Sequence, residues 1–204
     1  MTMPAPATRS SRKREAILAA ALDRFMTEGF AATSMDGVAA QAGVSKATIY
    51  AHFDSKAQLF AAVIRQKCEE ELIDITSWTY VGVDARATLT RLAQKLMTTL
   101  TSDRVMGLHR IVVAESVRYP ELAQAFWDAG PGYACPCFAA VFSELDKQGQ
   151  LVVPDPLMAA NLMVGMVKSE VFFRRLLGLS PRAEITPEKT VAACVDILMA
   201  AYRV

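Results

Sequence analysis

Residues 33–60 constrain the fold of this chain most, because two short helical patterns meet there at a turn that contains glycine. The first pattern starts near Met35 and repeats apolar residues at i, i+3 and i+4. Gly43 follows it, and glycine most easily adopts the left-handed conformation found just past a helix end. The second pattern, S-K-A-T-I-Y, starts at Ser45 and turns Ile49 toward a core. We therefore expect a helix-turn-helix arrangement, in which the second helix enters the DNA major groove.

Hydroxyl side chains predict where these helices begin. Thr33 precedes the first pattern, and Asp36 follows it at the spacing of a capping box. Ser45 is the expected cap of the second helix. Ser55 is the expected cap of a third helix, where Gln58 repeats the capping-box spacing.

The side chains left outside these helices share one chemistry. Lysine, small hydroxyls, tyrosine and histidine donate hydrogen bonds to phosphate oxygens or reach base edges. An ordinary antiparallel helix pair with a solvated polar face also carries such residues. The combination of turn, cap and an exposed K-A-T-x-Y-x-H face favours DNA reading over that alternative.

The run G-F-A-A-T-S-M-D-G-V-A-A-Q-A-G-V-S-K-A-T-I-Y-A-H-F-D-S-K-A-Q-L-F closely resembles the N-terminal domain of TetR-family transcriptional regulators. Residues 12–60 carry the resemblance, and the core G-V-S-x-x-T-[IL]-Y-x-H-F-x-S-K is its specific part. The run E-S-V-R-Y-P-E-L-A-Q-A-F-W also resembles the ligand-binding half of one subgroup.

The resemblance implies an all-α fold of about nine helices, with a three-helix DNA-binding domain followed by a larger helical ligand-binding and dimerisation domain. The expected domain limits are 11–60 and 61–204, after a disordered tail over residues 1–10, which are rich in Pro, Ala and Thr. By resemblance, the phosphate-binding residues are Thr33, Ser34, Ser45, Lys46, Tyr50, His52 and Lys56. Ala47 and Thr48 are the expected base-facing positions.

Composition and charge agree with a packed helical protein that presents one end to a polyanion. Hydrophobic residues make up 52% of the chain and charged residues 21%. Residues 1–67 hold nine Lys and Arg against five Asp and Glu, a net charge of +4, and the remainder carries −3. Arg9, Arg12 and Lys13 start the first expected helix, where they either touch DNA or form a solvated charge run. No apolar run reaches membrane-spanning length and no signal peptide is recognisable, so we expect a cytoplasmic protein without membrane partners.

Beyond the head, helical patterns continue without convincing period-two alternation. The first helix is expected to end at Gly29, and a connecting helix to run from Ser55 into the seventies. The later helices are expected over residues 85–101, 104–118, 120–148 with interruptions, 155–177 and 186–202.

Soft and aromatic side chains are frequent in this second half, and most of them are expected to be core. The family resemblance implies a ligand cavity, for which the candidate residues are Trp78, Met97, Met106, Trp127, Tyr133 and Phe138. His109 is more typical of a satisfied core histidine than of a ligand contact.

The last two expected helices carry more apolar surface than a monomer needs, and TetR-like subunits pair there. We expect a two-fold, four-helix interface made by Leu157, Met158, Leu162, Met163, Met166, Val191, Val195, Leu198 and Met199. Such a homodimer would hold two recognition helices roughly 34–36 Å apart or more on a palindromic operator.

These features predict a ligand-responsive regulator, most simply a repressor that a small apolar molecule releases from double-stranded DNA. An enzyme with a DNA-binding head, such as a recombinase, is disfavoured because no Ser/His/Asp set or phosphate loop is present. A helical ligand-binding or interaction protein without DNA binding is the other alternative. No cofactor or metal is expected. The pair Cys135 and Cys137 has no further ligand at metal spacing, so we expect a structural role for it, with a redox role as the alternative.

Overall fold

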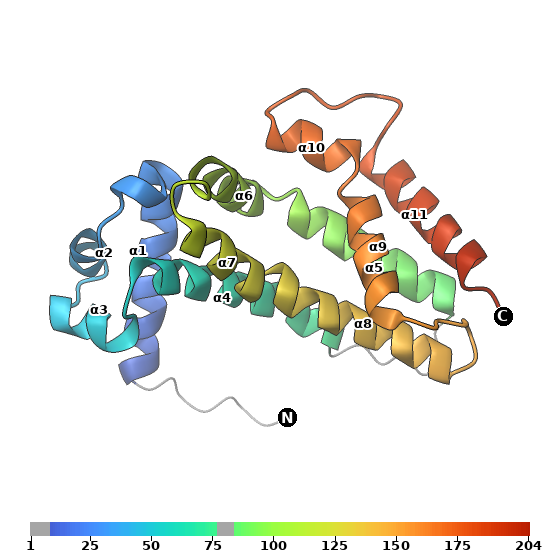
Figure 1. Cartoon of the computed structure of the whole chain (residues 1–204), viewed down its shortest axis with the longest axis horizontal. Helices are drawn as coiled ribbons and strands as arrows, with labels where there is room; N and C mark the ends of the chain where they lie inside the picture. The colour runs from blue at the N-terminus through green and yellow to red at the C-terminus, as the bar shows by residue number, and fades with distance from the viewer. Residues whose placement is uncertain (1–8, 77–83) are drawn as a thin grey trace. The chain divides into compact units, whose positions relative to one another are not determined.

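The computed structural model describes residues 9–76 and 84–204, and within these ranges the chain is helical. Its elements, drawn in Figure 1, are α1 (Arg9–Ala32), α2 (Met35–Gln41), α3 (Lys46–His52), α4 (Lys56–Thr76), α5 (Ala85–Leu100), α6 (Asp103–Glu115), α7 (Pro120–Ala129), α8 (Pro131–Lys147), α9 (Pro156–Val167), α10 (Glu170–Leu176) and α11 (Pro187–Ala201). Extended pairing in these ranges is limited to one isolated bridge, between Arg182 and Ile185. The predicted all-α class is confirmed.

Two of the expected helices are each divided in two. Residues 120–148 form α7 and α8, which separate at Gly130 because Pro131 begins the next helix. Residues 155–177 form α9 and α10, which separate at Lys168 and Ser169. These divisions account for the labels running to α11 where about nine helices were expected. In the part of the chain that the structure describes, no helix is both long and apolar enough to cross a bilayer.

Contacts between residues divide the chain into two compact units. The first unit holds the residues up to 67 together with residues 111–130, and the second holds residues 68–110 and 131–204. Helices α4 and α6 therefore contribute residues to both units. The contacts group residues 111–130 with the N-terminal part of the chain, whereas the domain limits drawn from the sequence stay a prediction.

The first unit has an aromatic core. Phe25 stacks on Phe30 with ring centroids 5.8 Å apart, and Phe60 of α4 meets both rings edge-on at 5.2 and 5.8 Å. Tyr119 closes the cluster with its ring 5.3 Å from that of Phe30. Gly29 places Phe30 there, because its φ of 79° breaks α1 at the predicted helix end. Beside this core, α2 packs on α1 and α3 packs on α2 (Figure 1).

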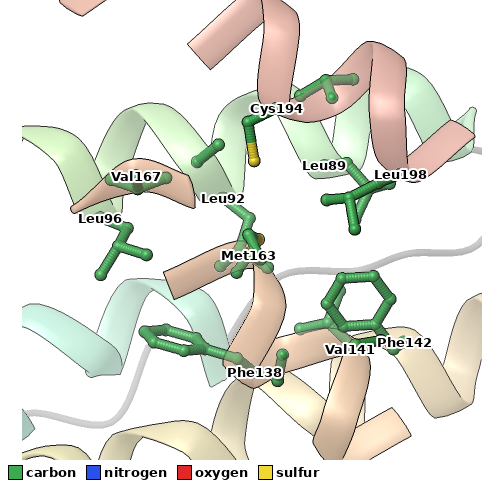
Figure 2. Packing of buried hydrophobic residues seen from close by; sticks show 14 of the residues in the cluster. Leu89, Leu92, Leu96, Phe138, Val141, Phe142, Met163, Val167, Cys194 and Leu198 are labelled. Carbon is green, nitrogen blue, oxygen red and sulfur yellow. The ribbon is translucent and has the colours of Figure 1, made fainter. Parts of the chain in front are cut away.

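The second unit has an aliphatic and Met-rich core, in which α8 packs on α9 and α11 on α5. In Figure 2, Met163 of α9 lies between labelled side chains of α5, α8 and α11. Four residues predicted for a dimer interface are buried in this core, which corrects that prediction: Met163, Val191, Val195 and Leu198. They are buried because α9 and α11 pack with these faces inside the protomer.

Candidate nucleic-acid interface

The start of α2 is fixed by Ser34 and not by Thr33. The Ser34 hydroxyl accepts a hydrogen bond from the Gly37 N–H at 3.1 Å, as an N-cap does. Thr33 is 2% exposed, and its hydroxyl donates to the Gly29 carbonyl at 2.7 Å. The predicted Thr33 cap is therefore wrong, because this hydroxyl holds the preceding turn and lies away from solvent.

The turn between α2 and α3 has the geometry expected from its glycine. Gly43 has a φ of +66°, and its N–H donates to the Ala40 carbonyl at 3.2 Å. The Val44 N–H reaches back to the Ala39 carbonyl at 3.0 Å. This pair of bonds is the Schellman motif, which satisfies the last carbonyl groups of α2 and sends the chain sharply into α3.

Helix α3 is fixed at its start and anchored from beneath. The Ser45 hydroxyl accepts from the Thr48 N–H at 3.1 Å, which confirms the predicted cap. Ile49 is fully buried and Phe53, just after the helix, is 5% exposed. The opposite side of α3 stays open to solvent, as predicted. Its exposed members are Ser45, Lys46, Ala47 and Tyr50, and its half-buried members are Thr48 and His52.

Lys46 provides a positive charge on the exposed face of α3. Its ammonium donates to the Asp36 carboxylate at 2.8 Å, and this hydrogen bond together with the charge of Asp36 raises the pKa of Lys46. Both side chains are well exposed, so the ion pair stabilises the fold little. A phosphate oxygen can therefore replace Asp36 as the partner of Lys46 at small cost.

Lys56 has a different environment. Its ammonium donates to the carbonyl groups of Phe30, Ala31 and Thr33 at 2.5, 3.1 and 2.9 Å. It also lies 4.5 Å from the centroid of the Phe30 ring. Burial lowers the pKa of Lys56, and the charge of Glu115 opposes that shift. All three donors of this ammonium are engaged in closing the end of α1.

The structure thus sorts the predicted DNA-contacting residues into two groups. Ser34 stands exposed at the start of α2, and the α3 face brings together Ser45, Lys46, Ala47, Thr48, Tyr50 and His52. Thr33 and Lys56 lie behind this face and hold its framework. Sequence reasoning missed one framework contact, in which the Gln41 amide donates to Asp23 at 2.7 Å and ties α2 to α1. The residues lie eighteen positions apart, so no local pattern announced it.

The predicted ligand-pocket residues are not brought together as a set. Met97, Met106 and Phe138 are buried in the second unit's core, and Tyr133 packs against it. Trp127 belongs to the first unit, where it is 58% exposed on α7, and Trp78 lies outside the described residues. Across the described ranges, no group of His, Cys, Asp and Glu side chains could hold a metal ion.

A shallow groove with a volume of about 640 Å³ lies within the first unit, between α4 and α7. Alanine side chains form much of its floor, and Arg65, Glu121 and Asp128 are among its lining residues. The groove includes none of the residues predicted from the sequence for DNA or ligand contact.

Comparison with known proteins covers both ends of the chain. Residues 17–63 match the family model of bacterial regulatory proteins of the tetR family, and residues 87–204 match that of the AefR-like transcriptional repressor C-terminal domain. The HTH-type transcriptional regulator RutR of Escherichia coli K12 is 48% identical over 56 residues, which are 28% of this chain and 26% of RutR. The part of the chain that matches therefore spans about a quarter of the length of RutR.

Longer similarities extend through the second unit. The HTH-type transcriptional activator FasR of Mycolicibacterium smegmatis is 28% identical over 159 residues, covering 78% of this chain and 69% of FasR. A crystal structure of a TetR-family regulator from Mesorhizobium loti is 30% identical with a TM-score of 0.82, over 97% of this chain and 100% of that one. The flavonoid-responsive regulator FrrA is 33% identical with a TM-score of 0.77, over 94% and 97% of the two chains. Because one family model covers residues 87–204 and another the helix-turn-helix, the chain belongs to the TetR family of DNA-binding transcriptional regulators.

Proposed function

We propose that the protein is a homodimeric repressor that binds a palindromic operator through α3 and leaves it when a small apolar molecule binds the second unit. The observation that carries the proposal is the polar face of α3, which stays open to solvent while the Ser45 cap and the Gly43 turn fix the helix. The match to a repressor C-terminal domain supports repression. We expect the regulator to act in the cytoplasm and to have no enzymatic activity of its own.

The proposed contacts follow from exposure and chemistry. Ser34, Ser45, Lys46, Tyr50 and His52 would donate to phosphate oxygens, and Lys46 would exchange Asp36 for a phosphate. Ala47 and Thr48 would face base edges, where a methyl group and a hydroxyl can distinguish bases. Thr33 and Lys56 would act from behind as positioning residues, because their polar atoms are engaged with backbone carbonyl groups.

The dimer is proposed because α3 spans only Lys46–His52 and offers few base contacts by itself. Apolar side chains remain exposed on α9, where Leu157, Met158 and Leu162 are 49%, 54% and 51% exposed. Ile197 on α11 is 56% exposed, and α11 packs on α9 within the protomer. These exposed side chains support a two-fold interface made by the outer faces of α9 and α11.

Control by a ligand is proposed for the second unit. FrrA is described as flavonoid-responsive, which supports a small-molecule effector for this chain. Helix α6 carries residues of both units, so a change at one of its ends can reach the other. The effector must bind one conformation more tightly than the other, since equal affinity shifts no equilibrium.

The decisive experiment measures binding of the full-length protein to DNA from upstream of its own gene by fluorescence anisotropy, over a range of salt concentrations. Lys46→Gln should weaken binding to every sequence and lower the salt slope by about 1, as expected for one lost phosphate contact. Thr48→Ala should change sequence preference while keeping the salt slope. If both variants bind like wild type, the contact assignment is wrong. Binding of small molecules without any DNA binding would support the alternative of a ligand-binding protein.

A further inference from the structure

One lysine of the second unit, Lys168, has no anionic partner among the residues that the structure describes. Lys168 follows α9 and is partly buried, with its ammonium 5.5 Å from the centroid of the Phe172 ring. Burial lowers the pKa of Lys168, and the neighbouring Cys135 thiol opposes that shift. Among the described residues, no carboxylate lies within ion-pair distance of this ammonium. Even a partly buried cation without a counter-charge costs free energy, so its presence calls for a reason.

A second polar group lies directly beside it. The Ser169 hydroxyl is buried, and within the described ranges it has no hydrogen-bond partner. Ser169 occupies the N-cap position of α10, yet its side chain makes no capping bond. A buried hydroxyl normally has a partner, because leaving it unsatisfied is costly. Lys168 and Ser169 are therefore adjacent donors that the described residues leave unused.

Two further helices, α6 and α8, contribute side chains to this place. His109 of α6 meets the Phe172 ring edge-on at 5.2 Å, so it lies against the same ring as Lys168. Burial lowers the pKa of His109, the Val105 carbonyl opposes that shift, and the charge of Lys168 adds to it. Burial raises the pKa of the Cys135 thiol on α8, and Lys168 opposes that shift. None of these neighbours brings a negative charge at neutral pH.

Apolar side chains border the same place. Val167 directly precedes Lys168, and Phe172 carries the ring that Lys168 lies over; both are buried in the second unit's core. Met106, three residues before His109 on α6, belongs to that core as well. A ligand with an apolar body and one polar end would meet apolar side chains and unused donors at the same time.

We propose that Lys168, Ser169 and His109 receive the acidic group, a carboxylate or an ionised phenol, of an otherwise apolar effector. The inference deepens the proposed function and rests on it, because only the proposed function makes the bound molecule an effector. The Lys168 ammonium and the Ser169 hydroxyl would each donate to the anionic oxygen, and the anion would supply the counter-charge that Lys168 lacks. A neutral effector of the same shape would leave the ammonium unpaired.

Two matched pairs of compounds test the inference by isothermal titration calorimetry without DNA. One pair is decanoate and 1-decanol, and the other is 7-hydroxyflavone and 7-methoxyflavone at a pH where the phenol is ionised. Wild type should bind the acidic member of at least one pair about tenfold more tightly, or better, as expected for a hydrogen bond to a charged group. The pair that shows the preference identifies the acid as a carboxylate or a phenol.

Substitutions locate the preference. Lys168→Gln should abolish it, while Lys147→Gln, at an exposed lysine of α8, should preserve it. Equal affinities within both pairs, no binding of any of the four compounds, or an unchanged preference in Lys168→Gln would each overturn the inference.

Folding of the variant is checked by thermal denaturation. Lys168→Gln should melt at the same temperature as wild type or above it, because it removes an unpaired buried charge. If it melts below wild type, Ser169→Ala replaces it in the binding test, since this change removes only a hydroxyl. Ser169→Ala should then weaken the acidic member several-fold and leave the neutral member unchanged, and an unchanged acid affinity would overturn the inference.

Operator anisotropy separates this inference from the proposed function. If the acid binds in a way that depends on Lys168 but releases no DNA, the inference stands and the proposed ligand response is wrong. If the acid releases DNA equally from wild type and Lys168→Gln, the proposed ligand response stands and the inference is wrong.

Discussion

The two compact units treat buried polar groups in opposite ways. In the first unit, the Thr33 hydroxyl donates to a carbonyl and the Lys56 ammonium donates to three. Arg24 leaves its Nε without an acceptor there, but its Nη2 pairs with Glu28 at 2.8 Å. In the second unit, the hydroxyls of Thr88 and Ser169 are buried without a partner among the described residues, and Lys168 lacks a carboxylate.

Under the proposed function, this difference corresponds to a rigid framework in the first unit and a ligand-binding interior in the second. Bonded polar groups fix backbone geometry, and in the first unit they hold the end of α1 behind the open face of α3. Unbonded buried polar groups cost stability, and under the proposed function the effector would bond to those of the second unit. This contrast agrees with the proposal that the first unit binds DNA on its outside and the second unit binds an effector in its interior.

The largest effect is expected from Phe60→Ala, which should destabilise the first unit by about 3–5 kcal/mol because a large buried ring leaves a cavity. Urea denaturation followed by circular dichroism should show an early loss of helix together with loss of DNA binding. Cys194 reports on the second unit, since burial raises its thiol pKa to about 11 and shields it from thiol reagents.

The matched control for this change is Met26→Ala, at a 38% exposed position of α1, which should cost less than about 0.5 kcal/mol. Cys194 should stay protected through the early transition of Phe60→Ala. If the Cys194 thiol becomes reactive at the urea concentration of the early transition, the two units unfold together. They would then differ in function but not in stability.

The substitutions Lys56→Gln and Lys46→Gln compare a lysine that holds the backbone with a lysine on the exposed face of α3. Lys56→Gln should cost about 1–3 kcal/mol of unfolding free energy, because backbone carbonyl groups lose a charged donor. Lys46→Gln should leave the free energy of unfolding close to that of wild type, since it breaks only an exposed ion pair. Chemical denaturation measures both. A Lys56→Gln variant as stable as wild type, with a reduced salt slope for DNA, would instead make Lys56 a phosphate contact, as the sequence predicted.

Local patterns predicted the helix-turn-helix well because its geometry is set by near neighbours. Ser45 caps a bond three residues on, and Gly43 closes bonds no more than five residues apart. Thr33 was misassigned because Ser34 next to it is an equally good cap, and only the fold shows which hydroxyl faces inward. The carbonyl partners of Lys56 lie 23 to 26 residues earlier in the chain, so no local pattern predicted these hydrogen bonds, and a phosphate contact of Lys56 stays a prediction.

The candidate ligand site was harder to predict because it depends on which helices meet. Residue type alone grouped Trp127 with Met97, yet residues 111–130 pack with the first unit. Lys168 carried no signal, since a lysine that follows a helix is ordinarily solvated. Its neighbours Phe172 of α10, Cys135 of α8 and His109 of α6 come from separate helices, and no local pattern contains their meeting.

A smaller effect is expected from one glycine in each unit. Gly43 and Gly149 both have a φ of +66°, and no heavy atom lies within 4 Å of an added Cβ at either position. Alanine at each site should therefore cost about the same, roughly 1–2 kcal/mol, from backbone strain alone. Thermal denaturation measures the cost, and only Gly43→Ala should weaken DNA binding, because it lies in the turn before α3. An equal loss of DNA binding in Gly149→Ala would show that the second unit shapes the interface without a ligand.

The smallest effect is expected in the pH dependence of the second unit. Burial, aided by Lys168, holds the pKa of His109 below its ordinary value of about 6.5. As the pH falls through 6.5, the unfolded chain binds this proton before the folded one does. The free energy of unfolding should therefore fall until the pH passes the folded-state pKa, where the loss levels off. Above pH 6.5 this contribution vanishes.

His109→Gln should remove that part of the slope, which urea denaturation between pH 8 and pH 5 can resolve as a difference from wild type. Nuclear magnetic resonance titration of His109 should also give a higher pKa in Lys168→Gln than in wild type, since one cause of the lowering is gone. A His109 pKa that does not respond would mean that the Lys168 ammonium lies too far from the ring to share an anion with it. The acid-binding group would then reduce to Lys168 and Ser169, and the second unit's interior would offer a smaller recognition site than its geometry indicates.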